Sequence, residues 1–209
     1  MVELIVLLFV AIALPLALML FAVRGRTRTI FAFMLCGLCA CLAAAFINTA
    51  FLRFLSVSKF YMTVNVTPII EEILKLLPLI VYTMAFKPER RDLLDAGIAC
   101  GIGFAMLENA LIIARAASSV SLFTAVVRGI GAGMMHALCV CIVAFGISLM
   151  QKRRKWFLPG TAALVICAMT VHSLYNILIQ SRFYLLGLLF NVVLYAVLLV
   201  TVRIRKTKN

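Results

Sequence analysis

The sequence predicts an all-α protein, a polytopic bundle of about seven transmembrane helices. Of its 209 residues 66% are hydrophobic and only 13% are charged, and the mean hydropathy is +1.17. Apolar runs of about 20 residues, the length that crosses a bilayer as a helix, recur along the chain. A soluble domain of this size could not bury so much apolar surface. The segments between the runs are short, so residues 1–209 are expected to form a single integral membrane domain.

Seven apolar segments are expected to cross the membrane: 2–23, 30–55, 68–86, 96–114, 122–150, 157–179 and 183–202. The first has Glu3 near its start instead of a basic region and is longer than the apolar part of a signal peptide, so an uncleaved span is expected. The third begins at Pro68, which suits the first turn of a helix. The fifth is long, which predicts a tilted helix or a short lead-in helix. The others have ordinary spanning lengths.

Glycine spacing predicts where these helices pack closely. Gly97-x-x-x-Gly101 lies in the fourth segment and Gly129-x-Gly131-x-Gly133 in the fifth, and small residues at such spacing let helix backbones approach. The second motif would need a preceding strand to act as a nucleotide-binding loop, and its surroundings are apolar and helical in pattern. Packing is therefore the preferred interpretation of both motifs.

Basic residues assign the two sides of the membrane. Fourteen Lys and Arg lie in the loops 24–29, 87–95 and 151–156 and in the tail after residue 202, whereas the alternate loops hold four. This asymmetry predicts an N-terminus outside and a C-terminus in the cytoplasm. The formal net charge of +13 is explained by these topology signals, so nucleic acid is not expected as a partner.

The seven cysteines all lie within apolar segments. Their number is odd, and the pairs Cys36-x-x-Cys39 and Cys139-x-Cys141 lack a matching half with zinc-finger spacing. We interpret them as small hydrophobic residues of the core.

Ionisable side chains at membrane depth are the strongest functional signal. Glu71, Glu72 and Glu108 fall inside apolar segments, as do both histidines, His136 and His172. Buried charges are costly in a bilayer and usually mark a functional site. Glu72, Glu108, His136 and His172 lie 12 to 15 residues from the cytoplasmic ends of their segments, about 18–22 Å into a core roughly 30 Å thick. They are therefore expected to share one layer in the outer half of the membrane.

Neighbouring residues extend this layer. Glu71 and Lys75 are four residues apart on one helix face, which predicts an ion pair, while Glu72 is rotated by roughly 100° and should meet different partners. His172 and Asn176 are one turn apart and can face the same cavity.

On the fourth segment, Phe104 and Glu108 share a face, and Asn109 beside the acid could support it. Arg128 is expected to extend towards the headgroups rather than to pair with a site acid.

Two chemistries use such a set of residues. In one, three carboxylate and imidazole ligands hold Zn²⁺ with an open position for water, and a further Glu acts as base. In the other, a Glu activates water directly while His and Asn stabilise the oxyanion. Both hydrolyse a carbonyl compound, and a peptide bond is the expected substrate. Three clustered carboxylates need positive charge; Lys75 supplies one, and either a metal or a proton on one Glu supplies the rest, with the metal favoured.

Four motifs in order resemble those of the PrsW family, a branch of the superfamily of CAAX prenyl proteases and bacteriocin-processing enzymes. The resemblance covers about residues 68–179, and the motifs are Glu71-Glu72-x-x-Lys75, Phe104-x-x-x-Glu108-Asn109, His136 with Gly146 ten residues later, and His172-x-x-x-Asn176. The CAAX branch carries His where this chain has Glu108, so prenylated proteins are the less expected substrates.

The resemblance implies a multi-pass intramembrane protease of the bacterial cytoplasmic membrane. Its expected substrate is a membrane-anchored protein, such as an anti-sigma factor, or a peptide precursor, cut near the extracytoplasmic side. The implied roles are base or water activation for Glu71 and Glu72, and oxyanion stabilisation for Asn176. Glu72, Glu108, His136 and His172 are the implied metal ligands if the site holds a divalent ion such as Zn²⁺, and Lys75 would keep a Glu ionised. The family includes glutamic and metallo-type descriptions, so the resemblance leaves the mechanism open.

Two other functions compete with hydrolysis. A non-catalytic scaffold of the same superfamily would keep buried histidines but has no need of the acids. A proton-coupled transporter also uses buried Glu and His, but it predicts broken helices and a two-fold repeat, which the hydropathy pattern lacks. The sequence leaves the substrate and the oligomeric state undetermined.

Overall fold

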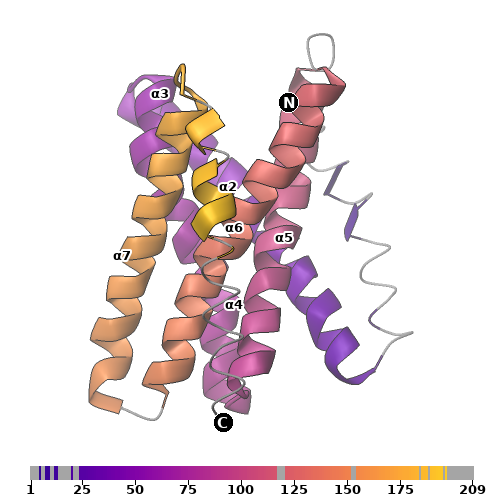
Figure 1. Ribbon diagram of the computed structural model, residues 1–209, viewed down its shortest axis with the longest axis vertical. Coiled ribbons are helices and arrows are strands. Elements are labelled where there is room, and N and C mark those ends of the chain that lie inside the picture. Colours follow the sequence, from indigo (N-terminus) through magenta and orange to yellow (C-terminus); the bar gives the residue numbers. More distant parts are fainter. Residues whose placement is uncertain are drawn as a thin grey trace.

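A computed structural model describes residues 24–116, 121–151, 154–183, 185–187 and 189–194, with the single positions 5, 8, 9, 12, 13, 20 and 196. In this part of the chain all regular structure is helical (Figure 1). The helices are α2 (Gly25–Leu55), α3 (Lys59–Tyr61), the π-helical segment η1 (Met62–Val66), α4 (Thr67–Phe86), α5 (Arg90–Arg115), α6 (Leu122–Met150) and α7 (Arg154–Ile179). The predicted all-α bundle is confirmed.

Helix α5 occupies the middle of the bundle. It packs against α2 on one side and α6 on the other, and α7 packs against α6 and α4. The long helices alternate in direction, so the starts of α2, α5 and α7 lie at the same end of the bundle as the ends of α4 and α6 (Figure 1). At that end Arg26 pairs with Asp95 and lies 3.9 Å from Asp92, which ties the start of α2 to the start of α5.

Four of the described helices are long and apolar enough to cross a membrane: Gly25–Leu55, Arg90–Arg115, Arg128–Leu149 and Lys155–Ile179. They match the predicted segments 30–55, 96–114, 122–150 and 157–179. Helix α4 matches the predicted segment 68–86 and is 20 residues long, but it carries three charged side chains within those residues. The count of seven spans and the orientation stay predictions.

The first predicted span lies largely, and the last partly, outside the described residues. Within 2–23, the buried side chains of Ile5 and Ala13 belong to a hydrophobic cluster with Leu38, Ala44 and Phe104. Within 183–202, Leu185–Leu194 forms a shorter apolar helix. Asn191 on this helix is buried, and its Nδ2 donates a hydrogen bond to the carbonyl oxygen of Gly131 on α6 (3.2 Å).

Glycines set the spacing of α5 from its neighbours. A Cβ added at Gly101 would lie 2.6 Å from the carbonyl oxygen of His136, and one added at Gly97 would lie 3.0 Å from the Cβ of Ala144. The predicted packing role of this motif is confirmed. A Cβ at Gly129 or Gly133 meets nothing within 4 Å in the described part of the chain, so close packing is not found at those two positions.

Local sequence explains where α4 begins and ends. Pro68 lies in its first turn, as predicted, because the nitrogen of that turn has no helical acceptor. The helix ends where Lys87 adopts a left-handed conformation (φ 46°) and donates its N–H to the carbonyl oxygen of Thr83. Pro78 inside the helix cannot donate an N–H to the carbonyl of Leu74. Between these ends α4 packs against α2, α5, α6 and α7.

Candidate active site

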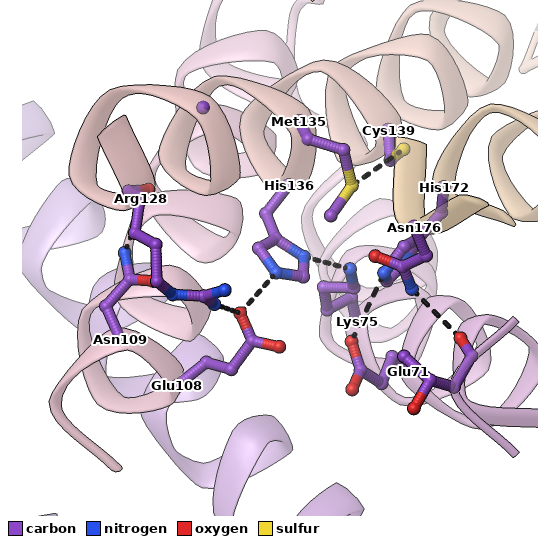
Figure 2. A network of polar contacts seen from close by, with 12 residues as sticks. Glu71, Lys75, Glu108, Asn109, Arg128, Met135, His136, Cys139, His172 and Asn176 are labelled. Atoms are coloured by element: carbon purple, nitrogen blue, oxygen red, sulfur yellow. Dashed lines mark hydrogen bonds and ion pairs between the residues drawn. The ribbon is translucent and has the colours of Figure 1, made fainter. Parts of the chain in front are cut away.

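A continuous set of polar contacts joins α4, α5 and α6 (Figure 2). Lys75 Nζ donates to Glu72 Oε1 (2.6 Å) and lies 2.9 Å from His136 Nδ1. On the other side of the same imidazole, His136 Nε2 lies 3.2 Å from Glu108 Oε2. The predicted layer is therefore a connected network, and His136 is at its centre.

His172 on α7 lies beside both carboxylates of α4. Its Nδ1 lies 2.7 Å from Glu72 Oε1, and its Nε2 lies 3.8 Å from Glu71 Oε2. The two imidazoles meet edge to face, with ring centroids 5.1 Å apart between His136 and His172. The prediction that Glu71 and Glu72 meet different partners is wrong, because both carboxylates lie beside His172, at opposite nitrogens of its ring.

The neighbours fix the tautomer of each neutral histidine. A carboxylate only accepts, so His172 Nδ1 carries the hydrogen that Glu72 receives, and its Nε2 presents a lone pair. An ammonium only donates, so His136 Nδ1 is the acceptor for Lys75, and its Nε2 donates to Glu108. The two rings therefore present a lone pair from different nitrogens.

Burial divides the network into a closed part and an open edge. The side chains of Glu72 and Lys75 are each 1% exposed, and that of His136 is 0% exposed. Glu108 and Arg128 are 26% and 23% exposed. Among the described residues of the network, Glu108 and Arg128 thus form an edge between α5 and α6 that is exposed at the surface of the bundle.

Phe104 forms an aromatic wall beside the closed part. Its ring centroid lies 4.8 Å from that of His136, and Lys75 Nζ lies 4.6 Å from the Phe104 centroid. The face of an aromatic ring attracts a cation, so this contact helps to hold a buried ammonium between Glu72 and His136. The structure thus places Phe104 against both His136 and Lys75.

Two predicted pairings differ from the observed ones. Lys75 pairs with Glu72, three residues before it, rather than with Glu71. Arg128 does not extend away from the network: its Nη2 lies 3.6 Å from Glu108 Oε2. In both cases the cation lies beside the acid that also binds a histidine, where negative charge is concentrated.

The two asparagines use their amide groups on backbone carbonyls. Asn176 Nδ2 donates to the carbonyl oxygen of Thr63 in η1 (3.0 Å), and Asn109 Nδ2 donates to that of Arg128 (3.4 Å). Asn109 therefore supports the backbone of α6, while Asn176 ties α7 to η1. Sequence reasoning missed the part played by η1 and by Asn191, since neither belongs to a recognisable motif.

Three side chains satisfy the spacing of a metal site. Glu71, His136 and His172 each offer a ligand atom within 4.8 Å of the others, and all three are buried. Glu71 Oε2 has no hydrogen-bond partner among the described residues and faces the lone pair of His172 Nε2. Two facing acceptors are unfavourable in a low-dielectric interior unless a proton or a metal cation lies between them.

The surroundings also fit a divalent cation. Glu72 and Glu108 each bind a histidine of the group through the nitrogen opposite its lone pair, which is how carboxylates orient metal-binding imidazoles. Two histidines and one Glu form a ligand set typical of catalytic zinc. Glu71, predicted as a base, is in this ligand group, whereas Glu72 and Glu108, predicted as ligands, lie behind the histidines.

The charges of the network are also compatible with a bound cation. Three ionised carboxylates face two fixed cations, Lys75 and Arg128, which leaves one excess negative charge when both imidazoles are neutral. A buried excess charge is costly, and either a proton on one Glu or a bound divalent cation would compensate the negative charge.

Comparison with known proteins identifies the family. A family model described as PrsW family intramembrane metalloprotease matches residues 25–202, which include every helix of the network. No curated protein and no solved structure matches the chain. The resemblance inferred from the four motifs is thereby confirmed. The chain belongs to the PrsW family and is an intramembrane metalloprotease.

Proposed function

We propose that this protein is an endopeptidase that cuts a membrane-anchored protein near its extracytoplasmic side. The observation that carries the proposal is the buried group of Glu71, His136 and His172, whose ligand atoms lie within 4.8 Å of one another. An anti-sigma-factor-like protein or a peptide precursor is the substrate class that the family resemblance implies. The depth of about 18–22 Å estimated from helix lengths supports a cut in the outer half of the bacterial cytoplasmic membrane.

The donor atoms are Glu71 Oε2, His172 Nε2 and His136 Nδ1. Nδ1 of His136 accepts from Lys75, so a ligand role for this ring would require Lys75 to give up this contact and keep its hydrogen bond to Glu72. When bound, a divalent cation such as Zn²⁺ activates water and polarises the scissile carbonyl. A ring of three protein ligands with an open position is the usual arrangement of such sites.

Glu72 is the residue that we assign as base. Lys75 and the Nδ1–H of His172 both donate to its Oε1, which favours the ionised carboxylate that must receive a proton from water. Glu108 holds His136 in its tautomer and lies at the open edge, where Arg128 faces it.

Asn176 is assigned as a donor to the oxyanion. Its Nδ2 now donates to the carbonyl oxygen of Thr63, so it already holds a peptide carbonyl next to His172. A substrate carbonyl would take the place of Thr63, which requires η1 to move away from α7. Donors aimed at the developing oxyanion are commonly worth about 10²–10³ in kcat.

Cleavage in liposomes tests this proposal. Purified protein would be reconstituted with single-span reporter peptides, and the products would be mapped by mass spectrometry. We expect cuts in the outer half of the span, abolished by a chelator and reduced at least about 100-fold in Glu72→Gln. Cys167→Ser, on the exposed surface of α7, is the matched control and should cleave normally. Cuts in the inner half, or full activity of Glu72→Gln, would refute the proposal.

A further inference from the structure

Two orphaned polar atoms lie at the open edge of the network. Arg128 Nε and Asn109 Oδ1 are both buried and have no hydrogen-bond partner among the described residues. The two residues are adjacent across α5 and α6, since Asn109 Nδ2 donates to the carbonyl oxygen of Arg128 (Figure 2). One orphan is a donor and the other an acceptor, and buried groups of this kind normally have partners.

The contacts within the network leave part of the Arg128 guanidinium without a partner among the described residues. Its Nη2 lies 3.6 Å from Glu108 Oε2, beyond an ordinary charge-assisted hydrogen bond, and the same oxygen already receives His136 at 3.2 Å. The guanidinium is 23% exposed and so reaches the surface through which a substrate would approach. Charge balance around Glu108 therefore explains the position of Arg128 but leaves its Nε–H without a function.

Proteolysis within a membrane creates a need for such atoms. A transmembrane substrate must unwind next to the scissile bond, which frees N–H and C=O groups that hydrocarbon cannot satisfy. Each unpaired group costs several kcal/mol in an apolar medium. An enzyme that offers a matched donor and acceptor beside its catalytic residues would lower that cost.

We propose that Arg128 and Asn109 form a positioning site for the main chain of the unwound substrate. In this site Arg128 Nε–H donates to a substrate carbonyl, and Asn109 Oδ1 accepts a substrate N–H. The inference rests on the proposed peptidase function and adds the groups that hold the substrate backbone beside the scissile bond.

A substrate main chain fits these atoms better than an acidic substrate side chain. A carboxylate has only acceptor oxygens, so it would face Asn109 Oδ1 and the negative charge of Glu108 without a hydrogen to share. A peptide segment carries a donor and an acceptor together and complements both orphans.

Kinetics of two variants test the site. Arg128→Lys keeps the positive charge near Glu108 but removes the Nε–H. Asn109→Leu removes the acceptor together with the Nδ2 donor to the Arg128 carbonyl. We expect each to raise KM for the liposome reporter about tenfold with kcat changed less than about threefold. Arg115→Lys and Thr170→Val, at exposed positions elsewhere, are the controls and should match the wild type. Wild-type KM in Arg128→Lys would show that the residue supplies charge alone, and would overturn the proposal.

Ester substitution of the reporter identifies the hydrogen bond itself. Replacing single amide N–H groups near the cut by ester oxygen should weaken wild-type binding about tenfold at one position. The same ester should cause no further loss in Asn109→Leu, because the acceptor is already gone. Equal losses in the wild type and in this variant at every position would contradict a bond to Asn109 Oδ1.

Reporter binding separates this inference from the peptidase proposal. Affinity would be measured by fluorescence anisotropy with the protein in detergent, whether or not cleavage occurs. Binding that weakens about tenfold in Arg128→Lys and Asn109→Leu, but not in the two controls, supports the site even if the wild type cuts none of the reporters. Cleavage by the wild type with unchanged binding in both variants overturns the inference and leaves the peptidase proposal intact. A wild type that neither binds nor cuts overturns both.

Discussion

At the residue scale, Glu72 is the acid on which the closed part of the network depends. Its Oε1 receives Lys75 at 2.6 Å and His172 Nδ1 at 2.7 Å, and its side chain is only 1% exposed. A buried ion pair contributes little net stability compared with an apolar pair, but loss of one partner leaves an uncompensated charge. Glu72 therefore affects both the stability of the fold and the orientation of His172.

Glu72→Gln should therefore lower stability as well as activity. We expect a loss of about 3–5 kcal/mol in unfolding free energy, because Lys75 stays buried without its partner. The double variant Glu72→Gln/Lys75→Met should recover most of the stability but not the activity, since it removes both charges together. Thermal unfolding in detergent measures both effects. A double variant as unstable as Glu72→Gln would contradict the pairing.

Sequence predicted which residues meet but not how they pair. The layer of Glu72, Glu108, His136 and His172 follows from helix lengths and is found as a connected network. The choice of Glu72 over Glu71 as the partner of Lys75 could not be predicted, because residues three and four apart are both neighbours on a helix. The contact of Lys75 with His136, 61 residues away, accompanies that choice, and it depends on tertiary packing.

At the element scale, α5 positions the site through its glycines. Gly101 lets α6 approach so closely that an added Cβ would lie 2.6 Å from the His136 carbonyl oxygen and 2.7 Å from Ala137 Cα. Both neighbours are backbone atoms, which cannot rotate away as a side chain could. The spacing of α5 from α6 therefore sets the distance between Glu108 and His136.

Gly101→Ala should separate these helices. Alanine favours a helix by up to about 1 kcal/mol over glycine, but overpacking of a tight interface costs about 1–3 kcal/mol, so a net loss of stability is expected. Cleavage should fall with it, because His136 moves away from Glu108. Gly129→Ala is the control, since an added Cβ there meets nothing within 4 Å in the described part of the chain. Equal unfolding temperatures and cleavage rates for the two variants would show that this contact does not position the site.

The two glycine motifs show what spacing alone predicts. Gly97 and Gly101 face α6 as their four-residue spacing indicates. Gly129 and Gly133 have the same spacing, yet a Cβ added at either would meet nothing within 4 Å among the described residues. The arrangement of the whole bundle decides which face of a helix meets a neighbour. A glycine motif alone therefore cannot predict whether its face is closely packed.

At the scale of the whole molecule, basic residues gather at one end of the bundle. The starts of α2, α5 and α7 and the ends of α4 and α6 share this end (Figure 1), which carries Arg24, Lys87 and, at the start of α7, Lys155. Hydropathy and charge were enough to predict the helical class and four of the spans. They could not predict that α4 would be enclosed with its charges paired, because this depends on partners from other helices.

Labelling of single introduced cysteines tests the predicted orientation. An impermeant thiol reagent applied outside intact cells should label Ser58→Cys and Ser181→Cys, which lie at the end opposite the basic loops. Lys87→Cys should react only after the membrane is made permeable, since the positive-inside asymmetry predicts a cytoplasmic loop. The native cysteines, all in apolar helices, provide the background. The reverse pattern would place the network in the inner half of the membrane.

Metal content tests the central assignment most directly. Protein purified in detergent would be analysed by mass spectrometry for bound zinc, in the wild type and in Glu71→Gln, His136→Ala and His172→Ala, with Cys167→Ser as control. The assignment predicts about one equivalent in the wild type and the control, and loss of most of it in each of the three variants. Undiminished zinc in those variants would contradict it, as would a metal-free wild type that still cleaves its reporter.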